Sequence, residues 1–137
     1  MRLKQFPITS LIAAIQKTVQ DGTGKKCLDF VPKDQPSPFY YVEFIGSQPG
    51  NSKTMFVTDY TVYIHVISEE SESTVPVYKY MDDLSEALTE DISIPDPYWL
   101  VFQRNDGVKS VYREETDEVH GVVQYTFRIS HGWKAKI

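Results

Sequence analysis

A long alternation of apolar and polar residues runs from Met55 to Ser68. This run is rich in β-branched and aromatic residues and contains neither glycine nor proline, which is typical of a β-strand. One set of alternate positions is apolar: Phe56, Tyr60, Val62, Ile64 and Val66. The other set contains Asp59, Thr61, Tyr63 and His65. The pattern predicts a long central strand with one face in the core.

A second alternating run, from Val119 to Ser130, predicts another strand with one buried face and one exposed face. Shorter strands are expected over 39–45, 98–102 and 109–115. Residues 27–31 are a weaker candidate for a short strand and are not counted in the predicted order. We expect a tight hairpin at Asn105-Asp106-Gly107, because Asp-Gly accepts the positive φ of such turns. The weak alternation over 109–115 indicates a strand at the edge of the sheet.

Two segments show the apolar periodicity of amphipathic helices. The first runs from Pro7 to Asp21, and the second begins near Pro76. The predicted order is therefore α-β-β-α-β-β-β. It favours an α+β fold with a single antiparallel β-sheet and two helices packed on one face. The apolar faces consist of Ile8, Leu11, Ile12, Ile15 and Val19 in the first helix and Val77, Tyr80, Met81, Leu84, Ala87 and Leu88 in the second.

Two polar segments lie outside these elements. Residues 46–54 contain two glycines and a proline among polar side chains, which predicts a mobile loop at the tip of a hairpin. Residues 131–137 form a basic segment that we expect to be a flexible tail. With 137 residues in all, we expect one α+β domain over 1–137.

Composition narrows the classes of function. The net charge of −5 disfavours specific or nonspecific nucleic-acid binding, which needs many basic contacts to phosphate. No apolar run approaches the roughly 20 residues of a membrane span, and no signal peptide is recognisable. The single cysteine, Cys27, fits a reducing cytoplasm, and we expect it to be an inert small side chain.

The sequence contains no familiar catalytic or nucleotide-binding motif, so we expect no catalytic, cofactor-binding or metal site. The three histidines, His65, His120 and His131, are isolated along the chain. If their strands pair, His65 and His120 would approach each other on the polar face. A metal site or an acid–base pair would then be conceivable there.

Several features of the chain occur together in one group of viral proteins. They are the Ile/Leu helix face from Ile8 to Val19, the proline-rich entry 35–42 into a strand, the strand 60–68, the face formed by Met81, Leu84, Ala87 and Leu88, and the final strand 120–129. In this layout the chain resembles the tail-completion and tail-terminator proteins of long-tailed bacteriophages. The resemblance covers most of the chain and rests on patterns of apolar residues.

The resemblance implies a non-enzymatic structural protein without a cofactor. Such proteins form homomeric rings, often hexamers, that cap the tail tube and meet the head connector. The expected partners are copies of the chain itself, tail-tube proteins and head-connector proteins. The expected location is the head–tail junction of the virion, after assembly in the bacterial cytoplasm.

A ring requires an interface in which one surface meets a different surface of the next copy. We expect the acidic face of the second helix, the loop 46–54 and the basic tail to form it. The candidate residues are Gly46, Gln48, Asn51, Lys53, Asp82, Asp83, Glu86, Glu90, Trp133, Lys134 and Lys136.

Two other functions stay open at the level of the sequence. The polar sheet face near Tyr63, His65 and His120 would suit a small-molecule-binding or enzymatic domain. The same α+β layout would also suit a bacterial protein-interaction module.

Overall fold

The computed structural model describes residues 2–134, which form two helices and five strands. This confirms the α+β class. The elements are α1 (Ile8–Thr23), β1 (Cys27–Leu28), β2 (Phe39–Pro49), β3 (Met55–Glu70), α2 (Val75–Ala87), β4 (Trp99–Arg113) and β5 (Glu118–Trp133).

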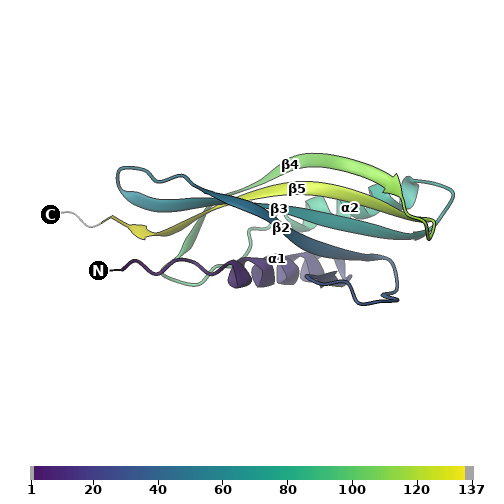
Figure 1. Ribbon diagram of the computed structural model, residues 1–137, viewed down its shortest axis with the longest axis horizontal. Coiled ribbons are helices and arrows are strands. Elements are labelled where there is room, and N and C mark those ends of the chain that lie inside the picture. Colours follow the sequence, from purple (N-terminus) through teal and green to yellow (C-terminus); the bar gives the residue numbers. More distant parts are fainter. Residues whose placement is uncertain (1, 135–137) are drawn as a thin grey trace.

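The strands form one long, twisted sheet in the order β1-β2-β3-β5-β4 (Figure 1). The predicted central strand is confirmed, because β3 pairs with β2 on one side and β5 on the other. The pairs among β2, β3, β5 and β4 are antiparallel, but β1 runs parallel to β2, so the sheet is mixed. The parallel pair arises because the segment between β1 and β2 carries the chain back before β2 begins, as a crossover must.

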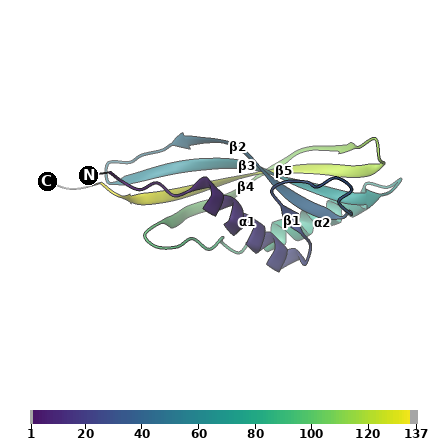
Figure 2. The same cartoon turned by 60° about the horizontal axis from the view of Figure 1, so that its bottom comes forward.

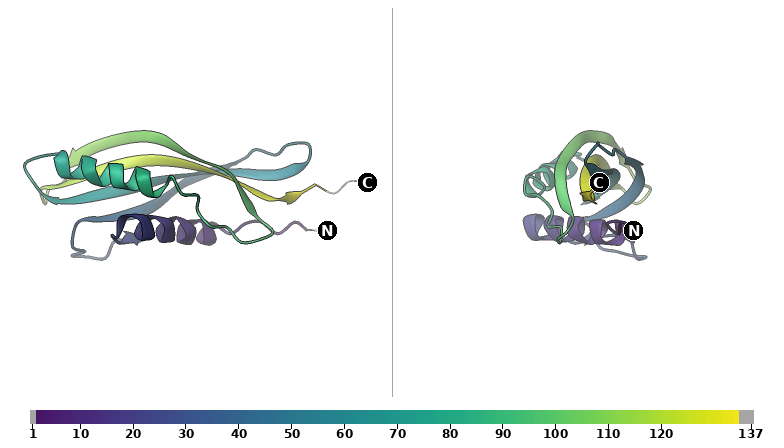
Figure 3. Two further views of the ribbon diagram at one scale, coloured as in Figure 1. Left: turned by 180° about the vertical axis from the view of Figure 1, so that it is seen from behind. Right: turned by 90° about the vertical axis from the view of Figure 1, so that its left-hand side faces the viewer.

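Both helices cover the same face of the sheet and contact each other (Figures 2 and 3). Their close approach depends on Gly22, in the last turn of α1. A Cβ at this position would lie 2.5 Å from Cβ of Ala87 in α2. Within residues 2–134, neither helix lies over the opposite face of the sheet.

The core lies between the helices and the apolar face of the sheet, as the alternation predicted. The exposed second face predicted for 119–130 is wrong in part, because neighbouring strands on both sides also bury His120, Val122 and Thr126. The central strand β3 and its neighbour β5 contribute most of the sheet side of the core, and the two helices pack against it from the other side. The buried side chains include Tyr60, Val62, Ile64 and Val66 from β3, Val123, Tyr125, Phe127 and Ile129 from β5, Leu11, Ile15 and Val19 from α1, and Val77, Met81 and Leu84 from α2.

The hairpin predicted at residues 105–107 is wrong, because β4 continues from Trp99 to Arg113 without a turn. Instead, the pairing with β5 shifts register between Asn105 and Gly107, and Gly107 takes a φ of 100°. Asp-Gly thus supplies the positive φ of a β-bulge. Pairing with β5 along nearly all of β4 outweighs the local preference for a turn. The predicted order also left out β1, so the observed order is α-β-β-β-α-β-β. Strand β4 lies at the sheet edge, as expected for 109–115.

Two predicted segment boundaries also change. β2 continues through residues 46–49, which pair with 58–61 of β3, so the connecting loop spans only 50–54. β5 continues to Trp133, so residues 131–133 belong to a strand and not to a separate tail. Residues 135–137 lie outside the described part of the chain.

Candidate functional site

Two histidines meet on the sheet face opposite the helices. Nδ1 of His65, on β3, lies 2.6 Å from Nε2 of His120, on β5, which confirms the predicted approach. Both residues are buried, with 8% and 4% of their surface exposed. They point away from the helices, because Gly121, the next residue in β5, faces Met81 and Val77 of α2.

A carboxylate faces the outer nitrogen of each ring. Oε1 of Glu43, on β2, lies 2.7 Å from Nε2 of His65. Oε1 of Glu114, in the turn after β4, lies 2.6 Å from Nδ1 of His120. These four residues, Glu43, His65, His120 and Glu114, form what we name the Glu–His–His–Glu chain. It crosses the sheet from β2 to the far edge and ties distant parts of the sequence together.

The geometry of the two rings is that of a hydrogen bond. Their centroids are 4.9 Å apart, which is about the sum of the N···N distance and the two ring radii, so the two nitrogens point at each other. Two nitrogens bound to one tetrahedral zinc would lie roughly 3.3 Å apart, given Zn–N distances of about 2.0–2.1 Å. The observed 2.6 Å is shorter than that. A proton on the line between the nitrogens explains the contact.

Each of the three contacts in the Glu–His–His–Glu chain needs one hydrogen between its two atoms, because two lone pairs would otherwise face each other. The contact between the two rings therefore contains one proton, shared between Nδ1 of His65 and Nε2 of His120.

Two tyrosines enclose the histidine pair. The ring of Tyr41 stacks on His65 at 4.1 Å between centroids and 5° between planes. The ring of Tyr112 lies 4.7 Å from that of His120, and its hydroxyl is 2.9 Å from Nδ1. Burial lowers the pKa of His65, and its hydrogen bond with Glu43 opposes this effect. Burial also raises the pKa of Tyr41 to about 12, so this tyrosine is a neutral phenol near pH 7.

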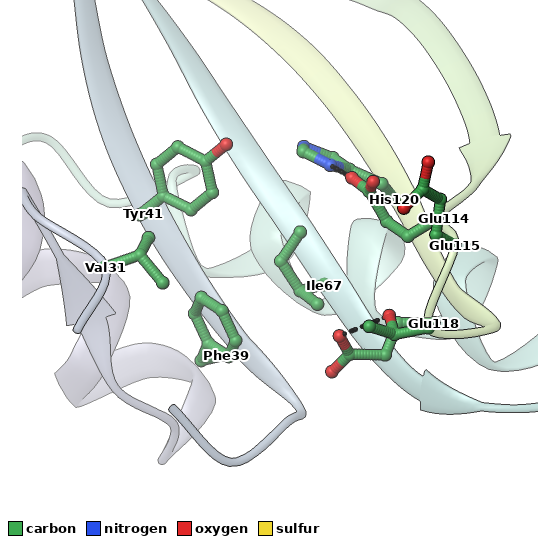
Figure 4. A pocket seen from close by; sticks show the side chains of 9 residues that line it. Val31, Phe39, Tyr41, Ile67, Glu114, Glu115, Glu118 and His120 are labelled. Carbon is green, nitrogen blue, oxygen red and sulfur yellow. Dashed lines mark hydrogen bonds and ion pairs between the residues drawn. The ribbon is translucent and has the colours of Figure 1, made fainter. Parts of the chain in front are cut away.

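A groove opens beside the Glu–His–His–Glu chain, at the end of the sheet where β3 finishes (Figure 4). Its volume is about 480 Å³. Apolar side chains from β2, β3 and the loop before β2 line one side, whereas glutamates of the β4–β5 turn and of the start of β5 line the other. We call it the acidic-rimmed groove, and its main lining residues are Val31, Phe39, Ile67, Glu114, Glu115 and Glu118.

The structure splits the predicted interface residues between separate regions. The loop 50–54 and the end of β5 lie together, because the Lys134 N–H donates to the Thr54 carbonyl at 2.7 Å. Here Trp133 is 61% exposed and lies 5.2 Å from Trp99 between ring centroids. The Lys134 ammonium lies 5.4 Å from the centre of the Phe56 ring. This region is an exposed basic and aromatic surface.

Other predicted residues have different surroundings. Gly46 and Gln48 lie within β2, and Lys53 is exposed in the loop. Asn51 shapes the loop, because its Oδ1 accepts a hydrogen bond from the Val57 N–H at 2.9 Å. Lys136 lies outside the described residues.

The acidic residues of the second helix are largely solvated. Asp82 and Glu86 are exposed and Asp83 is half-buried, whereas Glu90 lies beyond the end of α2 at Ala87. The structure does not bring any of them to the basic surface of the same chain, which lies at the other end of the sheet (Figure 1).

Sequence reasoning missed the role of His131. Its Nδ1 accepts the Phe6 N–H at 2.9 Å, and its Nε2 lies 2.7 Å from Oγ1 of Thr58. Sequence reasoning also missed Glu43, Tyr112 and Glu114 as partners of the histidines. No local sequence motif predicts these contacts. The only available signal is the alternation along the strand, which places Tyr41 and Glu43 on the same face.

Three further observations limit the chemistry of the described residues. Cys27 is 1% exposed, and burial raises the pKa of its thiol to about 12, so it is an unreactive core side chain. Within residues 2–134, no group of three or more His, Cys, Asp or Glu side chains is arranged to hold a metal ion. Neither α1 nor α2 has the length and apolarity needed to cross a bilayer.

Comparisons with known proteins show the family to which this chain belongs. Among curated proteins, none matches it significantly. In a solved structure titled "Virion of native gene transfer agent (GTA) particle", one chain has a similar fold, with a TM-score of 0.69 and 18% sequence identity. That match covers 92% of this chain and 99% of the other. A phage tail terminator family model, described as "Putative tail termination protein", matches residues 2–137. Because the match extends over nearly the whole chain, the protein belongs to this family of phage tail terminators, structural proteins of the tail region of the virion.

Proposed function

We propose that this chain caps the phage tail as a homo-oligomeric ring and joins the tail to the head connector, without catalysing a reaction. The observation that carries the proposal is the family match over residues 2–137. The chain of similar fold found in a gene transfer agent virion supports it, because that chain is part of an assembled particle.

The state of the ionisable groups on the free sheet face supports a structural role. The Glu–His–His–Glu chain links β2, β3, β5 and the β4–β5 turn through contacts of 2.6 to 2.7 Å. Its two histidines are buried, so they hold strands together and do not project toward solvent. A rigid sheet of this kind provides a stable surface for subunit contacts.

The charge of the chain is also compatible with a conduit for DNA. A net charge of −5 repels the phosphate backbone at long range. A ring of such subunits would let DNA pass without retaining it.

The test is assembly in the presence and absence of the protein. Tail-tube protein is polymerised with and without this chain, and tube lengths are measured by electron microscopy. Separately, light scattering on the purified chain gives its mass and so its oligomeric state. We expect tubes of limited length with a ring at one end, to which connector protein binds. Tubes of unchanged length with no additional density at either end would contradict the proposal.

A further inference from the structure

The two ends of the long sheet carry opposite charge. At one end, Lys53 and Lys134 lie beside the N-terminal segment, whose Lys4 carbonyl accepts a hydrogen bond from the Tyr98 hydroxyl at 3.2 Å. Lys4, Arg2 and Lys53 are all exposed. This basic end includes the exposed Trp133.

At the other end, β3 finishes at Glu70, which pairs with Glu118 at the start of β5. The turn between β4 and β5 adds Glu114, Glu115 and Asp117. The guanidinium of Arg113, a cation at this end, is engaged with the backbone carbonyls of Ser71 and Glu72. Glu114 is engaged with His120, whereas Glu115 and Glu118 are the rim glutamates that can face a further cation.

The acidic-rimmed groove combines this charge with apolar surface. Phe39 and Ile67 lie on its apolar side, and Glu114, Glu115 and Glu118 lie opposite (Figure 4). Its volume of about 480 Å³ is within the range of pockets that bury small organic groups. An aromatic side chain flanked by a cation matches both sides of the groove.

The basic end presents that combination. Trp133 is a large aromatic residue with 61% of its surface exposed, and the cation of Lys134 follows it directly. Exposed tryptophans commonly act as anchors that carry much of the energy of an interface. Opposite charges at the two surfaces would orient and accelerate the encounter.

We propose that Trp133 and Lys134 of one copy dock in the acidic-rimmed groove of a second copy, with the indole on the apolar side and the ammonium on the glutamates. The two surfaces of one chain cannot meet, because Trp133 pairs with Met55 at one end of β3 and the groove lies at Ile67 near the other end, about 40 Å away at the usual rise per residue. The contact is heterologous, so repeating it closes a ring if the rotation between copies allows. This inference rests on the proposed homo-oligomer and names its contact.

The first experiment tests docking directly. A synthetic peptide of residues 130–137 is added to the isotope-labelled full chain carrying Trp133→Ser, and backbone NMR shifts are followed. We expect shifts at Val31, Ile67, Glu115 and Glu118. Replacing the tryptophan of the peptide with serine should abolish them. No shift in the groove at millimolar peptide would overturn the proposal, whether or not the protein forms rings.

Two variants with the same change in net charge test whether the glutamates of the acidic-rimmed groove bind the peptide. The double variant Glu115→Lys, Glu118→Lys should weaken peptide binding by about tenfold or more, because it reverses the charge opposite the ammonium. The variant Asp82→Lys, Glu86→Lys makes the same change in net charge on α2 and should bind like the parent. Equal effects of the two variants would count against the groove as the site.

A mixing experiment separates this contact from the proposed function. The Trp133→Ser variant keeps its groove, and the Glu115→Lys, Glu118→Lys variant keeps its tryptophan. We expect each alone to be monomeric and their mixture to form a 1:1 dimer that cannot grow. If both variants still form rings, the proposed contact between Trp133 and the groove is wrong, whereas the proposed ring is supported. If the unaltered chain forms no ring even on tail tubes, the proposed function fails.

Discussion

The backbone N–H of Phe6 donates a hydrogen bond to Nδ1 of His131 at 2.9 Å, joining two residues 125 positions apart. Because a backbone N–H can only donate, Nδ1 of His131 must carry a lone pair. The ring proton therefore sits on Nε2, which donates to Oγ1 of Thr58 at 2.7 Å. A neutral histidine fastens the N-terminal segment to the sheet and leaves Phe6 buried, at 2% exposure.

Replacing His131 should loosen this attachment. We expect His131→Phe to lower the free energy of unfolding by about 1–3 kcal/mol, because it leaves the buried Phe6 N–H without an acceptor. His131→Asn is the matched control, since its side-chain oxygen lies near the position of Nδ1 and can accept the same bond. Urea unfolding of the three proteins at pH 7.5 measures the difference. Equal losses for the two variants would contradict this role of Nδ1.

The stability of the protein should fall as the pH falls below neutral. Burial lowers the pKa values of His131 and His65 below the ordinary 6.5, so the native state binds fewer protons than the unfolded state in this range. Unfolding then takes up protons, and the stabilisation present above pH 6.5 is lost on acidification. Melting temperatures measured between pH 7.5 and 5 check this expectation.

His131→Asn is informative here too. This variant should show a weaker pH dependence than the parent, while the contribution of His65 remains. A pH profile unchanged by the substitution would mean that His131 does not contribute to the acid sensitivity.

The two histidines of the Glu–His–His–Glu chain should be energetically coupled. His65→Gln and His120→Gln each remove one partner of the 2.6 Å contact and leave the other ring nitrogen buried without it. A double-mutant cycle should give a coupling energy of about 0.5–3 kcal/mol. As a control, His65→Gln and Asp59→Asn should be additive within about 0.5 kcal/mol, because Asp59 pairs with Arg128 elsewhere on the face. Additivity in both pairs would refute the shared proton.

Substituting alanine for each of three glycines should reduce the thermal stability of the protein by different amounts. At Gly22 the new Cβ would meet Cβ and Cα of Ala87 at 2.5 and 2.9 Å, so α1 and α2 must move apart. At Gly121 it would meet Sδ of Met81 at 2.9 Å, and this flexible side chain can shift. Nothing lies within 4 Å at Gly46. Thermal melts should rank the losses Gly22→Ala above Gly121→Ala above Gly46→Ala.

Gly22→Ala is the most informative of the three substitutions. Alanine is favoured over glycine inside a helix by about 1 kcal/mol, so helix propensity alone would make this variant more stable. Destabilisation would show that the contact between helices outweighs this preference. A more stable Gly22→Ala protein would mean that α1 and α2 pack less closely than the structure indicates.

Much of the fold follows from local patterns. Alternation along 55–68 and 119–130 marks both the strands and their buried faces, because side chains on a strand point to opposite sides. The apolar periodicity after Pro7 and Pro76 likewise marks both helices. The approach of His65 to His120 was predictable on the same basis, since it requires only that their strands be neighbours.

Other features depend on which strands become neighbours, and local sequence does not encode that. Asp106-Gly107 has the residues of a tight turn, yet pairing with β5 makes it a bulge within β4. Glu43 and Glu114 reach the histidines only because β2 and the β4–β5 turn flank the central pair.

The sequence by itself thus determined the two helices, the long strands β3 and β5 with the faces they turn to the core, and the family to which the chain belongs. The tertiary structure alone decided that a basic, aromatic end and an acidic-rimmed groove lie at opposite ends of one sheet. The physical reason is that periodicity depends on residues a few positions apart, whereas a hydrogen-bonded cluster or a groove depends on strand register, which brings together residues from distant parts of the chain.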